Sequence, residues 1–341
     1  MQEIKANINS KIIIDQRFSN INKYLTHKNT IIITDENLYN IYSNKFPENI
    51  PTIIIGTGES VKTLTTVEYI INKLIDFNVD RHTFLLGVGG GIVCDITGFV
   101  ASVYMRGIYF GFVSTSLLSQ IDASVGGKNG VNFNSYKNII GSFNQPKFVI
   151  CDTQMLKTLP QKEINNGMGE MLKHALIADA GMFNDINLNF DKILKLDNDI
   201  LPNLIFNNIK IKIRIVEKDE NEQNERKKLN FGHTLAHAIE KHSNLSHGEA
   251  VAVGIVFASY LSFKKGYINK HNFNEIINTI KKLGLPTSTN INKQKLAEAI
   301  TKDKKRNNNN IDLILLKNIG NAIIETYSIE QIKTEILNYE L

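Results

Sequence analysis

Residues 83–95 read T-F-L-L-G-V-G-G-G-I-V-C-D. An apolar run at residues 83–88 leads directly into three glycines at 89–91, and an apolar, helix-like stretch follows. This order predicts a strand, a glycine turn and a helix N-terminus, an arrangement that binds a pyrophosphate. The backbone N–H groups and the positive helix end point at the anion, and glycine permits its close approach. A plain structural turn is the alternative for a triple glycine considered alone.

The same alternation continues through the first half of the chain. Residues 61–77 carry apolar side chains at helical spacing and are predicted to form a crossover helix. The predicted strands are short runs rich in β-branched residues, at 11–14, 30–33, 52–55, 83–88, 109–113 and 148–150. Strands that alternate with helices indicate a Rossmann-like α/β domain with a mostly parallel sheet, which we place at residues 1–160.

Helical periodicity replaces the β-rich runs after Pro160. The predicted helices cover residues 164–178, 201–216, 231–241, 249–264 and 273–283. Two later runs, at 311–316 and 322–326, are predicted to be strands. We therefore expect a mostly α-helical domain at residues 161–341, with the active site in the cleft between the two domains.

Composition narrows the classes of function. The 341 residues carry a formal net charge of +5, and their lysines are scattered among acidic residues, so we expect no nucleic-acid partner. No apolar stretch reaches membrane-spanning length and the N-terminus lacks an apolar signal core, so we expect a cytoplasmic protein without membrane contact. Cys94 and Cys151 lie beside apolar runs without C-x-x-C spacing. They are predicted to be buried small residues.

The acidic residue that accompanies a dinucleotide-binding glycine turn is displaced in this sequence. The usual position, about 20 residues after the glycines, falls near Phe110 and Gly111. Asp35 and Glu59 instead follow two earlier predicted strands. A cofactor site here would therefore be a variant one, and either acid taken singly is better explained as a helix N-cap or first-turn residue.

Lysines follow the fifth predicted strand. Residues 122–128 read D-A-S-V-G-G-K, and Lys137 and Asn138 come shortly after. Two ammonium groups on glycine-containing loops suit the capture of a phosphate or carboxylate. The alternative is a solvated surface loop.

Carboxylate and imidazole side chains gather in the second half. They occur in three segments: residues 169–174 (G-E-M-L-K-H), 232–237 (G-H-T-L-A-H) and 246–249 (S-H-G-E). One carboxylate with two imidazoles is a recurring donor set for catalytic zinc. Spacing alone favours His233 with His237, four residues apart on one helix face, and leaves Glu170 with His174 as a rival pair.

Six motifs, in order between Asp35 and Lys305, resemble the 3-dehydroquinate synthase family. They are G-G-G-I-V-C-D, Y-M-R-G, S-L-L-S-Q-I-D-A-S-V-G-G-K-N-G-V-N, G-M-G-E-M-L-K, N-F-G-H-T-L-A-H-A-I-E and S-H-G-E-A-V-A-V-G. Glycerol dehydrogenases and iron-type alcohol dehydrogenases share the glycine turn and a carboxylate with two histidines. The S-V-G-G-K and G-H-T-x-x-H-A-I-E segments indicate the synthase branch.

The resemblance implies a catalytic metal, zinc with cobalt as an alternative, held by Glu170, His233 and His247. It makes His237 a proton-transfer residue that faces the substrate, and it gives His174 no role. The implied NAD contacts are Asp35, Asn37, Glu59, Lys62, Gly90, Gly91, Asp95, Thr115, Ser116, Asp122, Lys128, Lys137 and Thr158.

The resemblance also implies a set of substrate-binding residues and a dimer. The implied substrate contacts are Lys128, Asn138, Lys173, Lys212, Arg226 and Asn230, with Lys304 or Lys305 from the polar tract. Arg106 is implied to reach into the neighbouring subunit's site, so a homodimer is expected.

The implied reaction converts 3-deoxy-D-arabino-heptulosonate 7-phosphate to 3-dehydroquinate and phosphate. NAD serves catalytically, through transient oxidation, phosphate elimination, re-reduction and intramolecular aldol closure. The substrate carries a phosphate and a carboxylate, and Arg226 can clamp a planar carboxylate with two hydrogen bonds.

Three alternatives are another sugar-phosphate cyclase, a metal-dependent alcohol or glycerol dehydrogenase, and a non-catalytic nucleotide-binding sensor. The other cyclases' substrates lack the carboxylate, so Arg226 and Lys212 favour the synthase. A simple dehydrogenase has little use for so many lysines, and a sensor would tolerate the loss of His237 or a metal ligand, none of which is lost.

Overall fold

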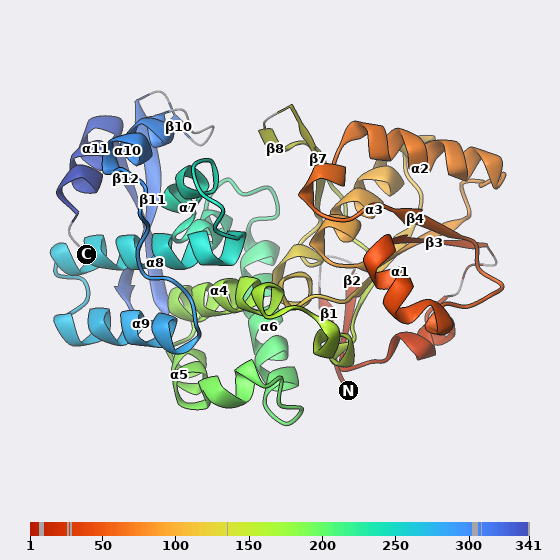
Figure 1. Ribbon diagram of the computed structural model, residues 1–341, viewed down its shortest axis with the longest axis horizontal. Helices are drawn as coiled ribbons and strands as arrows, with labels where there is room; N and C mark the ends of the chain where they lie inside the picture. The colour runs from red at the N-terminus through yellow and green to blue at the C-terminus, as the bar shows by residue number, and fades with distance from the viewer. Residues whose placement is uncertain are drawn as a thin grey trace. The chain divides into compact units, whose positions relative to one another are not determined.

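The computed structural model describes residues 1–6, 10–25, 27, 29–134, 136–301, 306–307 and 309–339. The chain divides into two compact units, Met1–Leu159 and Pro160–Leu341 (Figure 1). Within the described ranges, every helix is too short or too polar to span a bilayer.

Unit 1 is built on a seven-stranded sheet in the order β1-β2-β9-β6-β5-β3-β4. The strands are β1 (Gln2–Ala6), β2 (Ser10–Ile14), β3 (Thr30–Asp35), β4 (Thr52–Ile55), β5 (Phe84–Gly89), β6 (Phe110–Ser114) and β9 (Phe148–Cys151). β1 pairs antiparallel with β2, whereas the other neighbours run parallel. The chain passes from β3 outward to β4 and then returns to β5 on the other side of β3. The strand order therefore reverses between β3 and β5, where open parallel sheets bind ligands.

Continuous apolar runs produce the central strands of this sheet. Every residue of β5 is buried, as are all residues of β3 except its last. This is the pattern of parallel strands covered on both faces. Helices α1 (Glu36–Tyr42), α2 (Leu64–Asp76) and α3 (Gly91–Val103) pack against strands β3, β4 and β5. The predicted Rossmann-like domain with a mostly parallel sheet is confirmed.

The crossover helix begins later than predicted. Thr63 caps α2 by accepting a hydrogen bond from the Thr66 backbone N–H, and Glu59–Val61 forms a separate 3₁₀ turn, η3. Val67, Ile70 and Leu74 are the buried face of α2, at the helical spacing used for the prediction.

A two-stranded hairpin, β7 (Lys128–Phe133) and β8 (Tyr136–Phe143), occupies the region predicted to be glycine-containing loops. Most of β8 is exposed, so its sequence shows no alternation of apolar and polar residues. β7 packs on α3 at Gly98, where an added Cβ would lie 1.9 Å from the Asn129 side-chain oxygen. Only glycine allows this approach.

Unit 2 is mostly helical, as predicted. Its longer helices are α4 (Gln161–Ala178), α5 (Ala180–Leu194), α6 (Leu201–Lys218), α7 (His233–Glu240), α8 (His247–Lys264), α9 (Lys270–Lys282), α10 (Lys293–Thr301) and α11 (Ile329–Asn338). An antiparallel sheet adds β10 (Arg306–Asn307), β11 (Asn310–Asn318) and β12 (Asn321–Ser328). The last two strands cover the two runs predicted to be strands, whereas α5, α10 and α11 were not predicted.

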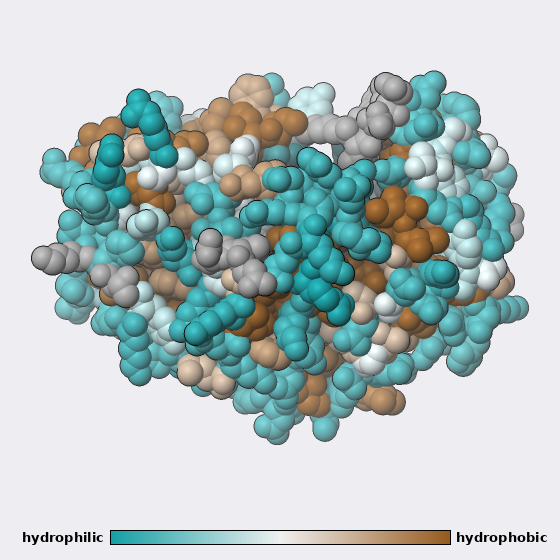
Figure 2. All heavy atoms as spheres, turned by 180° about the vertical axis from the view of Figure 1, so that it is seen from behind, coloured by the Kyte–Doolittle hydropathy of each residue, from teal (hydrophilic) through white to brown (hydrophobic). Residues whose placement is uncertain are grey.

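Polar side chains dominate the visible surface (Figure 2), and apolar side chains are buried in the cores. The face seen in Figure 2 is largely hydrophilic, with scattered apolar patches. Cys94 and Cys151 are free and buried, which confirms their predicted structural role. Burial raises the pKa of both thiols well above the usual value.

Candidate metal centre and cofactor site

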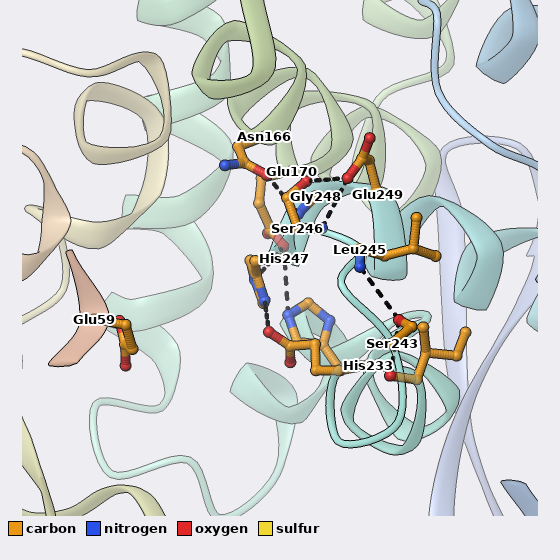
Figure 3. Close-up of polar contacts among 12 residues, drawn as sticks. Glu59, Asn166, Glu170, His233, Ser243, Leu245, Ser246, His247, Gly248 and Glu249 are labelled. Atoms are coloured by element: carbon orange, nitrogen blue, oxygen red, sulfur yellow. Dashed lines mark hydrogen bonds and ion pairs between the residues drawn. The ribbon is translucent and has the colours of Figure 1, made fainter. Parts of the chain in front are cut away.

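Three helices of unit 2 supply the residues of a candidate metal centre. Glu170 lies in the middle of α4 and is fully buried. His233 is the first residue of α7, and His247 is the first residue of α8. Ser246 and Glu249 form a capping box that fixes the start of α8 (Figure 3). Both imidazoles therefore stand at helix N-termini, where the backbone geometry is well defined.

Glycines let these helices approach closely. An added Cβ at Gly254 of α8 would lie 1.9 Å from the carbonyl oxygen of Gly232, the residue before α7. Gly232 itself has φ +80°, in the left-handed region that favours glycine. An added Cβ at Gly169 of α4 would lie 2.6 Å from the Gly248 carbonyl oxygen. These contacts bring the starts of α7 and α8 to the middle of α4.

The three side chains point toward one another, as Figure 3 shows. Glu170 Oε1 lies 3.4 Å from His233 Nε2 and 3.3 Å from His247 Nε2. The candidate ligand atoms all lie within 4.8 Å of one another. Glu170 Oε1 is buried and makes no hydrogen bond of good geometry within the described part of the chain. A carboxylate oxygen and two imidazole nitrogens that face one point fit the donor set of a catalytic zinc ion.

Burial and neighbouring charges shift the pKa values of all three side chains. Burial alone would raise the pKa of Glu170, but the ion-paired Lys173 ammonium and His233 outweigh it and hold that pKa well below its usual range. Burial lowers the pKa of His233 to about 4. Burial acts the same way on His247, but its contacts with the Glu170 and Glu240 carboxylates prevail and raise its pKa to about 10. The two carboxylates thus stabilise the positive charge of the His247 imidazole.

The two pairs favoured by spacing are arranged differently. His237 lies one turn after His233 on α7, with ring centroids 5.7 Å apart at 85°, and is not part of the ligand group. His174 Nδ1 lies 2.7 Å from the side-chain oxygen of Asn208 on α6, which makes His174 part of the helix packing. The structure gathers Glu170, His233 and His247, and it also brings a ligand atom of His174 within 4.8 Å of one of Glu170.

Unit 2 contains three of the predicted substrate-binding cations as buried residues. Lys173, Lys212 and Arg226 are exposed by 1%, 6% and 1%. The Arg226 guanidinium donates to the Glu220 carbonyl, and Asn230 Nδ2 donates to Glu222 Oε1 over 2.7 Å. Buried charges are costly unless they are paired, and Lys173 is paired with Glu170. Lys304 and Lys305 lie outside the described residues.

In unit 1, predicted cofactor residues lie where the strand order reverses. Asp35 ends β3 and caps α1 by accepting the Leu38 N–H over 2.9 Å, and burial raises its pKa. Gly90 caps α3, and an added Cβ there would lie 3.3 Å from Ser116 Oγ. Gly91 is the first residue of α3. The glycine turn and Asp35 therefore follow the adjacent strands β5 and β3.

A continuous polar network joins several other predicted cofactor residues in unit 1. Asn132 Nδ2 donates to Glu59 Oε1 over 2.7 Å, and its side-chain oxygen accepts the Asn138 N–H over 2.9 Å. Lys62 Nζ donates to the Asn138 side-chain oxygen over 2.6 Å and forms an ion pair with Asp95. Asn132, for which no role was predicted from the sequence, connects the hairpin to the segment that carries Glu59 and Lys62.

The remaining predicted residues are dispersed through unit 1. Thr115 and Ser116 are buried just after β6, and Asp122 lies in a short π-helix, η5 (Ser119–Ala123). Thr158 Oγ1 lies 2.8 Å from the Tyr42 hydroxyl. The exposed ones are Asn37, Lys128, Lys137 and Arg106.

Arg106 stands out by its backbone. Met105, Arg106 and Gly107 have φ angles of 48°, 66° and 120°, so three consecutive residues lie in the region disfavoured for side-chain-bearing residues. Such strain persists when the surroundings enforce it, and it occurs frequently at functional sites.

Comparison with known proteins agrees with this geometry. A model of the 3-dehydroquinate synthase N-terminal region matches residues 52–166, and a model of the C-terminal region matches residues 167–306. The chain belongs to the 3-dehydroquinate synthase family. The 3-dehydroquinate synthase of Thermoanaerobacter pseudethanolicus is 41% identical over 92% of this chain and 91% of its own length. That of Campylobacter concisus is 44% identical over 80% of this chain and 79% of its own length.

Solved structures show the same fold as this member of the 3-dehydroquinate synthase family. A 2-deoxy-scyllo-inosose synthase, solved with carbaglucose-6-phosphate, NAD⁺ and Co²⁺, matches with a TM-score of 0.85 at 24% identity, over 98% of this chain and 99% of its own. A 2-epi-5-epi-valiolone synthase from Streptomyces hygroscopicus, solved with NAD⁺ and Zn²⁺, matches with a TM-score of 0.88 at 22% identity, over 99% and 97%. This chain therefore shares the fold of these two synthases.

Proposed function

We propose that this chain is a 3-dehydroquinate synthase that uses NAD and a divalent metal, zinc or cobalt. The main support is that both halves of the chain match models of this family. In addition, the ligand atoms of Glu170, His233 and His247 lie around one point. The identity of 41% to a curated 3-dehydroquinate synthase supports the substrate, 3-deoxy-D-arabino-heptulosonate 7-phosphate.

We assign the domains and cofactor sites accordingly. Residues 1–160 would bind NAD through the glycine turn and Asp35, and residues 161–341 would bind the metal and most of the substrate. When bound, NAD would accept and return a hydride, and the metal would polarise the substrate hydroxyl that is oxidised. The solved cyclases with NAD⁺ and Co²⁺ or Zn²⁺ share this fold, which supports both assignments.

The chain's own side chains would bind the anions and move protons. The buried Lys173, Lys212 and Arg226 would neutralise the phosphate and carboxylate of the substrate, with Lys128, Asn138 and Asn230 as further contacts. His237, one turn from His233, would shuttle the hydroxyl proton, a role that suits an imidazole near neutral pH.

We further propose a cytoplasmic homodimer in which Arg106 completes the neighbouring subunit's site. Arg106 is exposed on a strained turn, and Val103 and Met105 beside it are each 45% exposed. The Ser102 hydroxyl accepts hydrogen bonds from Ser142 Oγ and Asn144 Nδ2, so this turn lies next to the exposed strand β8. Exposed apolar side chains around a cation fit a contact with another subunit.

The decisive assay supplies the heptulosonate phosphate with catalytic NAD and zinc and follows both phosphate and 3-dehydroquinate. We expect both products in equal amounts without net NADH formation. Stoichiometric NADH would indicate a dehydrogenase instead. Turnover restricted to glucose 6-phosphate or sedoheptulose 7-phosphate would indicate one of the other cyclases.

A further inference from the structure

The two imidazoles of the candidate metal centre are held by different kinds of partner. His233 Nδ1 lies 3.1 Å from the backbone carbonyl oxygen of Phe231. His247 Nδ1 lies 3.4 Å from Glu240 Oε1. In each case the other ring nitrogen, Nε2, faces Glu170. One ring is thus oriented by the main chain and the other by a carboxylate.

We propose that Glu240 is a positioning residue that fixes the tautomer and orientation of His247 for metal binding, an inference that rests on the metal centre of the proposed function. A carboxylate that accepts the Nδ1–H bond leaves the Nε2 lone pair for the metal and strengthens the imidazole as a ligand. Glu240 thereby acts through His247 and not on the metal itself.

Burial explains why His247 needs this partner more than His233 does. The His247 side chain is 33% exposed, compared with 11% for His233, so neighbouring side chains restrict its ring less. The Glu240 side chain is only 10% exposed, and a carboxylate held that far from water acts on its partner with little solvent screening.

Glu240 stands at the end of its helix that disfavours a negative charge. It is the last residue of α7, where the helix dipole disfavours a negative charge. His233 begins the same eight-residue helix. One short helix therefore supplies a metal ligand at its first residue and the orienting carboxylate for a second ligand at its last.

Glu240 is placed as a partner of a ligand, not as a ligand. Its Oε1 faces Nδ1 of His247, on the opposite side of the ring from the Nε2 that faces Glu170. Glu240 is also not among the residues whose donor atoms converge with Glu170 and His233.

The test measures zinc affinity by competition with a chromophoric chelator, together with the visible spectrum of the Co²⁺ form. We expect Glu240→Ala to weaken zinc binding by about 10- to 100-fold, the range for such outer partners, and to alter the Co²⁺ spectrum. Glu240→Gln keeps an oxygen that accepts the Nδ1–H bond and should lose less. Glu275→Gln is the control, because it removes the same charge from α9, which supplies no metal ligand, and should keep the affinity within about threefold.

The outcomes separate this inference from the proposed function. Wild-type affinity and an unchanged Co²⁺ spectrum in both folded Glu240 variants would overturn the role of Glu240 alone. If Glu240→Ala does not fold, the affinity and spectrum of Glu240→Gln decide. An equal loss in Glu275→Gln would also overturn it, since the loss would then follow from removing any negative charge from unit 2. A wild-type chain that binds no metal would overturn both the inference and the proposed metal centre.

Discussion

Of His237 and His247, only His247 belongs to the group of candidate metal ligands. His247 Nε2 lies 3.3 Å from Glu170 Oε1, whereas His237 stands one helical turn along from His233 and outside the ligand group. Because a direct ligand contributes more than an outer partner, we expect His247→Ala to weaken zinc binding by more than about 100-fold. Activity should be lost with it. Zinc content after dialysis and the assay described above measure both.

His237→Gln provides the contrast. It should retain zinc at wild-type affinity while activity falls by about 100-fold or more, within the range for loss of a general acid or base. The reverse result, with metal lost in His237→Gln and kept in His247→Ala, would assign the metal to the pair of histidines on α7.

The sequence was sufficient to predict the residue types of this site, but not which of the histidines bind the metal. Glu170 and the histidines were evident as zinc donors, and spacing then favoured His233 with His237, since four residues bring two side chains onto one helix face. His247 lies on another helix, and only the packing of α8 on α4 brings it opposite Glu170. The prediction of His247 as a metal ligand came from the family resemblance. The orienting contacts of Phe231 and Glu240 were missed because they depend on ring orientation.

At the scale of elements, the contact between α7 and α8 sets the geometry of the centre. Gly254→Ala would place a methyl group 1.9 Å from the Gly232 carbonyl oxygen, so the two helices must separate. We expect a loss of about 1–3 kcal/mol in the free energy of unfolding, the usual cost of overpacking. Zinc affinity should also fall, because His233 begins α7. Urea denaturation and chelator competition measure the two effects.

Gly181→Ala in α5 is the matched control. Its added Cβ would meet only the Asp179 side-chain oxygen that caps α5, at 3.3 Å and not 1.9 Å, so stability should change much less. Equal losses in both variants would show that the effect reflects glycine replacement in general, and not the contact between α7 and α8.

The hairpin in unit 1 depends on Asn132. This side chain bonds both Glu59 and the backbone of Asn138, and its own N–H donates to the Lys62 carbonyl over 2.8 Å. Asn132→Ala should weaken NAD binding by up to about 10-fold, because each net hydrogen bond contributes about 0.5–1.5 kcal/mol. Isothermal titration with NAD measures this.

Asn144→Ala serves as the control for the hairpin, since it removes a bond to Ser102 at 3.1 Å and leaves Glu59 untouched. NAD affinity should stay near wild type in this variant. If Asn132→Ala binds NAD as the wild type does, the network does not support the cofactor site.

Elements could be predicted where burial imposes a pattern. The central strands of unit 1 were found because continuous apolar runs are buried on both faces, as in β3 and β5. The hairpin was missed because β8 is mostly exposed and carries no apolar alternation. α5 was missed because polar Asn residues interrupt its apolar spacing, and its backbone departs from helical geometry at Asn189.

At the scale of the whole molecule, each active site of the proposed dimer would contain residues from both chains. An interface with two-fold symmetry would give each site one Arg106 from its partner. Arg106→Ala should then be nearly inactive as a pure protein while it still binds zinc and NAD, because neither set of ligands includes it. Activity and ligand titrations on the same preparation measure this separation.

Mixing two inactive variants tests whether Arg106 acts across the subunit boundary. In a mixed dimer of Arg106→Ala and His237→Gln, one site has its own His237 and receives Arg106 from the partner, and the other site lacks both. Random exchange makes half of the dimers mixed, so activity should recover to about a quarter of wild type. A mixture of His237→Gln with His247→Ala should stay inactive, since both residues belong to one chain's site. If the first mixture also stays inactive after subunit exchange has been verified, Arg106 serves its own chain and the shared site is wrong.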